Sequence, residues 1–243
     1  EMQRIVFGRY LDSHACRNGE WRLTHRTYVL DGSTNRPTTA MRPDPPVDNT
    51  NFGAAGAKGA ADPGRTLIAL AEASFPGVKP VTAQPDAAAL DAALSKLAIH
   101  DLSMAYCRGV DRADVELLKS VFHEDSTVLT GAFNGSGPAF CEHITTTCPG
   151  NMDYCFHSVA NQWIEVKGDH AVGEHYAIAH VTAGGNDLMV GGRYVDSYER
   201  RDGVWKIKSR TFVYDWTTTH PTTNMQGDFY AALKNRGECG KGD

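Results

Sequence analysis

The strongest signal for the fold is a stretch that begins with Gly192-Arg193-Tyr194-Val195-Asp196-Ser197 and extends to Asp215. Polar and apolar residues alternate on both sides of Asp202-Gly203, which is the spacing of a strand with one buried face. A dipeptide of this type between two alternating runs is a strong signal for a tight turn. The stretch therefore predicts a β-hairpin.

A similar sequence near the N-terminus predicts a second hairpin. Gly8-Arg9-Tyr10-Leu11-Asp12-Ser13 begins a run that turns at Asn18-Gly19 and ends at Asp31, and 12 of the 24 positions between 8–31 and 192–215 are identical. The late copy has a whole domain in front of it, whereas the early copy has nothing. We interpret the chain as a tandem duplication that has lost most of its first member, so that the natural N-terminus is missing.

The residues that precede the late hairpin predict the rest of a complete domain. Turn residues separate four expected strands, at 154–166, 170–183, 187–200 and 204–216. Apolar spacing predicts a helix from Asp86 to Cys107 that is ended by Gly109, with one buried face made of Leu90, Leu94, Leu97, Leu102 and Ala105. A second helix is expected to begin at Asp111, followed by a strand at 126–131 and a helix at 138–147.

These elements predict an α+β domain, with helices packed on one face of a curved antiparallel sheet and a cavity at its open end. The expected divisions are a remnant hairpin and tail at 1–41, a Gly/Pro/Ala-rich linker at 42–85, the complete domain at 86–218 and a tail at 219–243. A short helix is expected inside the linker, at 67–75. The exposed apolar strands of the remnant should dock on the outer face of the domain's sheet.

The bulk composition excludes several classes of partner. The formal net charge is −5 and the pI about 6.1, which argues against nucleic acid and anionic membranes. No apolar run approaches 18 residues, and we expect a cytoplasmic protein. None of the six cysteines forms a CxxC pair; reduced thiols are favoured over a Cys141–Cys148 or Cys148–Cys155 disulfide.

Several segments resemble the SnoaL-like branch of the NTF2-like superfamily, and within it the dehydratase and dehydrochlorinase type. The likeness covers about residues 89–216, and its most specific run is Tyr198-Glu199-Arg200-Arg201-Asp202-Gly203-Val204-Trp205-Lys206; the other segments are 98–102, 109–111, 156–157 and 191–194. The resemblance implies an NTF2-like cone. It also implies that Asp111 and His157 are a catalytic pair, that Arg210 is an active-site arginine, and that Tyr106 matches a tyrosine of a bile-acid dehydratase relative.

The pair also makes chemical sense from its residue types alone. A histidine can accept a proton near neutral pH, and a carboxylate on its far nitrogen fixes the tautomer and stabilises the imidazolium. Proton abstraction followed by elimination needs no nucleophile, and we expect neither a cofactor nor a metal. His170, His175 and His180 do not suggest a metal site, because a spacing of five alternates between faces of a strand.

Each candidate residue also has a structural alternative. Asp111 could cap a helix, while His157 and Tyr106 could be ordinary core residues. Arg210 falls on the face of Lys206 and Lys208 in a strictly alternating strand. An inward Arg210 therefore shares a face with two lysines or needs a β-bulge, and surface exposure is the alternative.

The sequence therefore predicts a cofactor-independent lyase acting on a small apolar cyclic molecule. His157 would be the base, Asp111 its orienting group, Tyr106 an acid and Arg210 an anion stabiliser. The alternatives are an isomerase or cyclase with the same pair, or a non-catalytic binding or assembly module. A homo-oligomer formed through the sheet face remains open.

Overall fold

The computed structural model describes residues 2–18, 20–37 and 86–224. The described residues of the N-terminal segment, up to Arg36, and those from Ala87 onward belong to one compact unit. The expected linker and its helix at 67–75 lie outside the described residues, as does most of the expected C-terminal tail. In the part of the chain that is described, no helix has the length and apolarity needed to cross a membrane.

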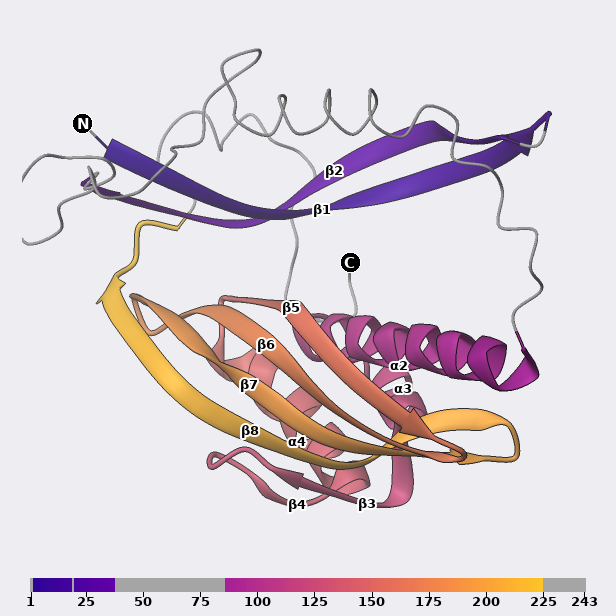
Figure 1. Cartoon of the computed structure of the whole chain (residues 1–243). Helices are drawn as coiled ribbons and strands as arrows, with labels where there is room; N and C mark the ends of the chain where they lie inside the picture. Colours follow the sequence, from indigo (N-terminus) through magenta and orange to yellow (C-terminus); the bar gives the residue numbers. More distant parts are fainter. Residues whose placement is uncertain (1, 19, 38–85, 225–243) are drawn as a thin grey trace, which may run out of the picture. The chain divides into compact units, whose positions relative to one another are not determined.

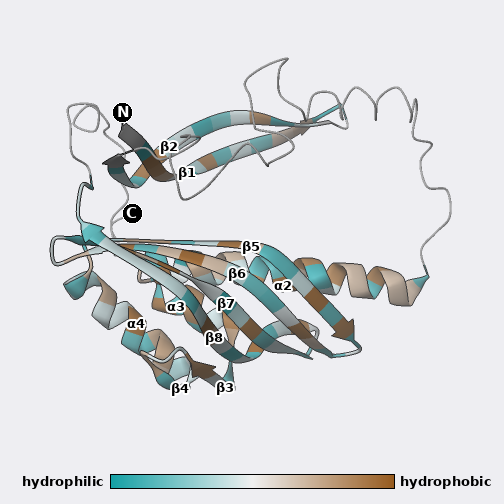
Figure 2. Cartoon of the chain, turned by 60° about the vertical axis from the view of Figure 1, so that its left-hand side comes forward, coloured by the Kyte–Doolittle hydropathy of each residue, from teal (hydrophilic) through white to brown (hydrophobic). Residues whose placement is uncertain are grey.

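The domain is built on a six-stranded sheet with the order β4-β3-β8-β7-β6-β5. The four expected strands are confirmed as β5 (Tyr154–Lys167), β6 (His170–Ala183), β7 (Asn186–Arg201) and β8 (Val204–Pro221), and Figure 2 shows polar and apolar residues interleaved along them. The turns are also confirmed, since Gly168, Gly184 and Gly203 have the positive φ that such turns require.

The predicted α+β fold with its curved, largely antiparallel sheet is confirmed, and one pair of its strands is parallel. β3 (Phe122–Leu129) pairs with the short β4 (Asn134–Ser136) in antiparallel fashion but runs parallel to β8. A hairpin turn imposes opposite directions only on strands that follow each other in the chain. A helix and four strands separate β3 from β8 in the chain, so no local turn sets their relative direction.

Three helices cover one face of this sheet, as Figure 1 shows: α2 (Ala87–Asp111), α3 (Val115–Val121) and α4 (Gly137–Asn151). The expectation that Gly109 ends the first helix is wrong, because α2 continues for two further residues. A Cβ at Gly109 would lie 2.6 Å from Cγ of Leu118. The glycine therefore serves the close approach of α2 and α3 rather than a helix end.

The predicted buried face of α2 also needs correction. Leu90, Leu94 and Leu97 are exposed, whereas Leu102 and Ala105 pack against the core as predicted. Helical spacing identifies an apolar stripe but does not say how far a sheet reaches along it. The C-terminal half of α2 thus contributes most to the core, and it is this half that carries the candidate site.

The N-terminal segment forms the expected hairpin, with β1 (Met2–Arg17) and β2 (Glu20–Pro37) as a separate two-stranded sheet. Within the larger compact unit, the Phe7 ring stacks on the imidazole of His180 at 4.3 Å between centroids. The backbone N–H of Asn35 donates to Oγ1 of Thr223 at 2.7 Å. The origin of this hairpin in a duplicated domain stays an interpretation of the sequence.

Candidate active site

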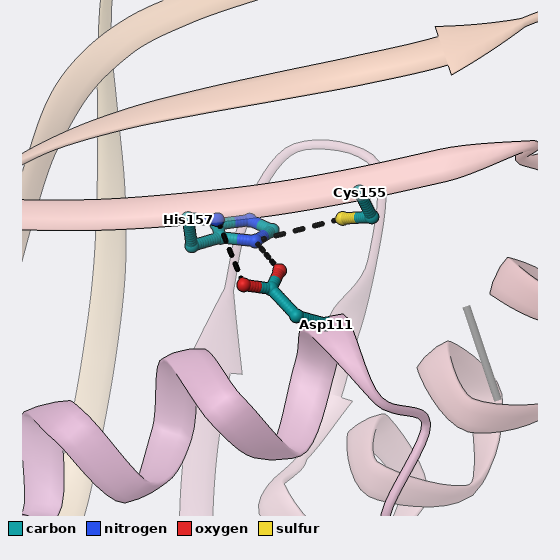
Figure 3. A group of neighbouring side chains, drawn as sticks. All are labelled: Asp111, Cys155 and His157. Atoms are coloured by element: carbon teal, nitrogen blue, oxygen red, sulfur yellow. Dashed lines mark hydrogen bonds and ion pairs between the residues drawn. The ribbon is translucent and has the colours of Figure 1, made fainter. Parts of the chain in front are cut away.

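The C-terminus of α2 and the start of β5 bring Asp111 and His157 together (Figure 3). Nδ1 of His157 lies 2.7 Å from Oδ1 of Asp111, and the backbone N–H of His157 donates to Oδ2 at 2.9 Å. An ionised carboxylate can only accept, so Nδ1 carries the proton and Nε2 presents a lone pair. The histidine is thereby held in the tautomer that a general base needs.

Asp111 does not cap the second helix, so that alternative is wrong. Asp114 is the N-cap of α3, and its side chain accepts a hydrogen bond from the N–H of Leu117 at 3.0 Å. Asp111 is instead the last residue of α2 and is buried. Both of its carboxylate oxygens are consequently directed to His157.

The side chain of His157 lines a cavity of about 270 Å³ whose walls are mostly apolar. Such a cavity can hold one small ring compound and offers few groups that would hold a strongly polar ligand. The residues that line it are Tyr106, Val110, Thr130, Ala132, Phe140, Ile144, Cys148, Met152, Cys155, His157, Ala177, Ala179, Val181, Val190, Tyr194 and Phe212.

Cys155 lies beside the pair, although the sequence suggested it only as a possible disulfide partner and not as a site residue. Its Sγ is 3.6 Å from Nδ1 of His157. The available signal was the spacing of two along a strand, which places both side chains on one face. Asp111, Cys155 and His157 each offer one atom within 4.8 Å of the others, a donor set that would suit Zn²⁺. Within the described residues Cys141, Cys148 and Cys155 form no disulfide.

Tyr106 lies on the same helix as Asp111, five residues earlier, and lines the cavity. Its ring stacks on that of Phe140, with centroids 6.2 Å apart. Burial raises the pKa of Tyr106 to about 12, against the opposing effect of the Arg210 charge. The phenol therefore keeps its proton at neutral pH, which an acid must do.

Arg210 is buried, so the surface alternative for this residue is wrong. The pairing of β7 with β8 shifts register after Ser197, where Lys208 is the extra residue, and this bulge turns Arg210 inward. The guanidinium is bound by Asp196 through Nε–Oδ1 and Nη2–Oδ2 contacts of 2.9 and 2.7 Å. Arg210 is not among the residues that line the cavity, although Tyr106 is.

The sequence did not indicate which residues surround Arg210. Tyr198 donates to Oδ2 of Asp196 at 2.8 Å, and Nε2 of His175 lies 2.6 Å from the Tyr198 hydroxyl. The alternation of side chains along residues 194–198 could have predicted that Asp196 and Tyr198 lie on the same inner face of the sheet. His175 and His180 do point to different surroundings, since His180 stacks on Phe7.

Comparisons with known proteins agree with this architecture. Residues 91–211 match the family described as a SnoaL-like domain. The chain is 27% identical over 134 residues to gamma-hexachlorocyclohexane dehydrochlorinase from Sphingobium indicum, which covers 53% of this chain and 86% of that protein. Hexachlorocyclohexane dehydrochlorinase 1 of the same species is 28% identical over 123 residues, covering 49% and 80% respectively.

Among solved structures, a LinA type 2 hexachlorocyclohexane dehydrochlorinase is 25% identical with a TM-score of 0.49, covering 52% of this chain and 89% of that one. The family match begins within α2 and ends within β8, so it includes every element that carries a candidate site residue. Residues 91–211 belong to the SnoaL-like family, in agreement with the NTF2-like resemblance of the sequence.

Proposed function

We propose that this domain is a cofactor-independent lyase that eliminates a small group from an apolar cyclic molecule. The observation that carries the proposal is the imidazole of His157, oriented by a buried carboxylate and facing an apolar cavity. The two curated relatives named above are dehydrochlorinases, which supports an elimination rather than a hydrolysis.

In the proposed reaction Nε2 of His157 takes a proton from the carbon next to the one that bears the leaving group. The electron pair of the broken C–H bond forms the new double bond, and the leaving group departs with the electron pair of its own bond. Asp111 stabilises the imidazolium. Tyr106 donates its proton to a departing hydroxyl, which leaves as water, and the proton on His157 restores the phenol through solvent.

Arg210 contributes to this proposal from behind the cavity wall. Its guanidinium carbon lies 4.0 Å from the centre of the Tyr106 ring, and the guanidinium forms an ion pair with Asp196 at 2.7 Å. A leaving anion would therefore meet the phenol first. We propose that the stabilising effect of Arg210 on developing negative charge passes through Tyr106.

Activity on a panel of chlorinated and hydroxylated cyclohexanes tests the proposal, with alkene products measured by gas chromatography and mass spectrometry. Asp111→Asn should lower kcat by up to about 10⁴-fold, because the wrong tautomer is then favoured. His157→Ala should be comparably inactive. His170→Ala is the control, since His170 is exposed at the start of β6.

The masses of the products separate elimination from its alternatives. Loss of HCl or water identifies a lyase, whereas a product of unchanged mass identifies an isomerase or cyclase. Full activity of the Asp111→Asn and His157→Ala variants would contradict the assignment of the pair. Absence of turnover on the whole panel, with the ligand still bound, would favour a binding module.

A further inference from the structure

Three side chains with different metal-binding atoms meet beside the cavity. Asp111, Cys155 and His157 each offer one atom within 4.8 Å of the others, and Figure 3 shows them directed toward one another. Asp111 comes from the C-terminal end of α2, whereas Cys155 and His157 lie two residues apart on β5 and share one face of that strand. Carboxylate, thiolate and imidazole are the donors that Zn²⁺ takes in proteins. The helix and the strand thus supply one of each.

The spacing of these atoms is close to the spacing of the ligands around a tetrahedral zinc ion. Bonds of about 2.3 Å to sulfur and about 2.0–2.2 Å to nitrogen and oxygen place S and N roughly 3.5 Å apart, and N and O roughly 3.4 Å apart. Sγ of Cys155 lies 3.6 Å from Nδ1 of His157, which already fits. Nδ1 lies 2.7 Å from Oδ1 of Asp111, so these two atoms must separate slightly when a metal replaces the proton between them.

The charges of the three ligands cancel those of a divalent cation. Carboxylate and thiolate each carry one negative charge and neutral imidazole none, so a bound Zn²⁺ gives a neutral group. Neutrality is important because Asp111 and Cys155 are only 6% and 3% exposed, and an uncompensated buried charge is costly. The positive charge of the next residue, Arg112, is paired with Asp31 at 3.3 Å. Asp111 is also the last residue of α2, where the helix carbonyls favour a cation.

The surroundings hold one ligand in place and leave room for a fourth. The backbone N–H of His157 donates to Oδ2 of Asp111 at 2.9 Å, which orients the carboxylate and leaves Oδ1 for the metal. Cys155 and His157 both line the apolar cavity, so a metal can enter from the cavity and keep a water molecule on that side. Three protein ligands with an open fourth position distinguish this arrangement from a closed structural zinc site.

We propose that Asp111, Cys155 and His157 reversibly bind a thiophilic divalent cation such as Zn²⁺ or Cd²⁺, and that the bound metal prevents His157 from acting as a base. The thiol proton goes to solvent. The metal takes the place of the proton on Nδ1, and Nε2 gains a proton in exchange, so one proton is released for each metal bound. Nε2 then presents an N–H to the cavity instead of a lone pair. The metal is therefore an inhibitor and not a resident cofactor.

Isothermal titration calorimetry with Cd²⁺ tests the ligands without any turnover. Wild type should bind one equivalent. Cys155→Ser should bind Cd²⁺ more than about 100-fold more weakly, because even the groups that support a metal ligand contribute about 10- to 100-fold to affinity. Asp111→Asn should also weaken binding, since it removes one of the two negative charges. Mg²⁺, which prefers oxygen ligands, should not compete with Cd²⁺.

Cys148→Ser is the matched control, because Cys148 is a second buried thiol in the wall of the same cavity but belongs to no group of metal-binding atoms among the described residues. It should bind Cd²⁺ as tightly as wild type. Equal weakening in Cys148→Ser and Cys155→Ser overturns the site, as does tight binding that survives in Cys155→Ser and is lost when the exposed Cys16 is replaced by serine. If Cys155→Ser does not fold, an unchanged affinity of Asp111→Asn overturns the site.

Nitrogen-15 NMR of the imidazole tests the effect on the base. In the metal-free protein Nδ1 of His157 should carry the proton, and one equivalent of Zn²⁺ should leave the proton on Nε2 instead. A metal-bound protein that keeps the proton on Nδ1 would overturn the proposed inhibition.

The metal site does not depend on the proposed function, whereas the inhibition rests on it. A protein that binds Cd²⁺ through Cys155 but turns over no compound upholds the metal site and contradicts the lyase. A lyase whose activity is unchanged by saturating Zn²⁺ contradicts the inhibition alone.

Discussion

The β1–β2 and β7–β8 hairpins carry the same side-chain contacts in two very different surroundings. In β1–β2, Arg26 binds Asp12 through contacts of 2.8 and 2.7 Å and covers the Tyr10 ring at 4.1 Å. At the equivalent positions of β7–β8, Arg210 binds Asp196 at 2.9 and 2.7 Å and covers the Tyr194 ring at 4.3 Å. A second ion pair is repeated as Arg9–Asp31 and Arg193–Asp215, both at 3.1 Å.

Burial is what distinguishes the two copies. Trp21 is 74% exposed and Leu23 46%, whereas their counterparts Trp205 and Ile207 are 6% and 0% exposed. The Arg26 side chain is 46% exposed and that of Arg210 only 1%. Water screens the first ion pair, while the second lies where an unpaired charge would be very costly. Identical local contacts thus acquire different energies from the layer that covers them.

The largest expected effect comes from removing the buried arginine. Arg210→Met should lower the free energy of unfolding by about 3–5 kcal/mol, because Asp196 is left as an unpaired buried charge. Arg26→Met should leave the urea midpoint unchanged within error, since Asp12 is then simply solvated. Urea denaturation followed by circular dichroism measures both. Equal shifts of the urea midpoint in the two variants would show that burial does not distinguish the two ion pairs.

A somewhat smaller difference should separate the apolar counterparts. Ile207→Ala should cost about 2–4 kcal/mol of unfolding free energy through lost burial and the cavity left behind. Leu23→Ala removes a side chain that is already half in water and should cost far less. The same denaturation experiment ranks the two. A larger effect at Leu23 would mean that a further part of the chain covers this face.

Deletion of the N-terminal hairpin tests whether this copy stabilises the domain. Removing residues 1–31 should lower the melting temperature by a few degrees or cause aggregation, because the Phe7–His180 stacking is lost and apolar surface is exposed. NMR shifts of the His157 imidazole should stay unchanged, since Asp111 and His157 both belong to the domain. Unaltered stability and solubility would contradict a docked hairpin.

The smallest expected effect is that of chelation. The purified protein should contain no stoichiometric zinc, flavin or nicotinamide, and EDTA should change any lyase activity by less than about twofold, because His157 needs only Asp111 to act as a base. Elemental analysis and assays before and after dialysis measure this. One equivalent of bound metal, lost in a Cys155→Ser variant, would identify Asp111, Cys155 and His157 as ligands instead.

The sequence predicted one part of the candidate site well and another part poorly. The pairing of Asp111 with His157 followed from the family resemblance and is present as a hydrogen bond. Tyr194 and Asp196 went unnoticed, although they occur in the repeated segment. Their importance depends on Arg210 pointing inward, which strict alternation does not predict.

The sequence alone predicts the features that depend on neighbours in the chain, namely the strands with their period of two and the turn at Asp202-Gly203. Such features need only contacts between residues close in sequence or facing across one turn. Three features depend on the tertiary structure: the end of α2 at Asp111, the bulge at Lys208 that turns Arg210 inward, and the burial of Trp205 and Ile207 where their counterparts Trp21 and Leu23 are exposed. These depend on α2 packing against strands that lie some 40 to 120 residues later in the chain, and no local pattern reports how such distant segments meet.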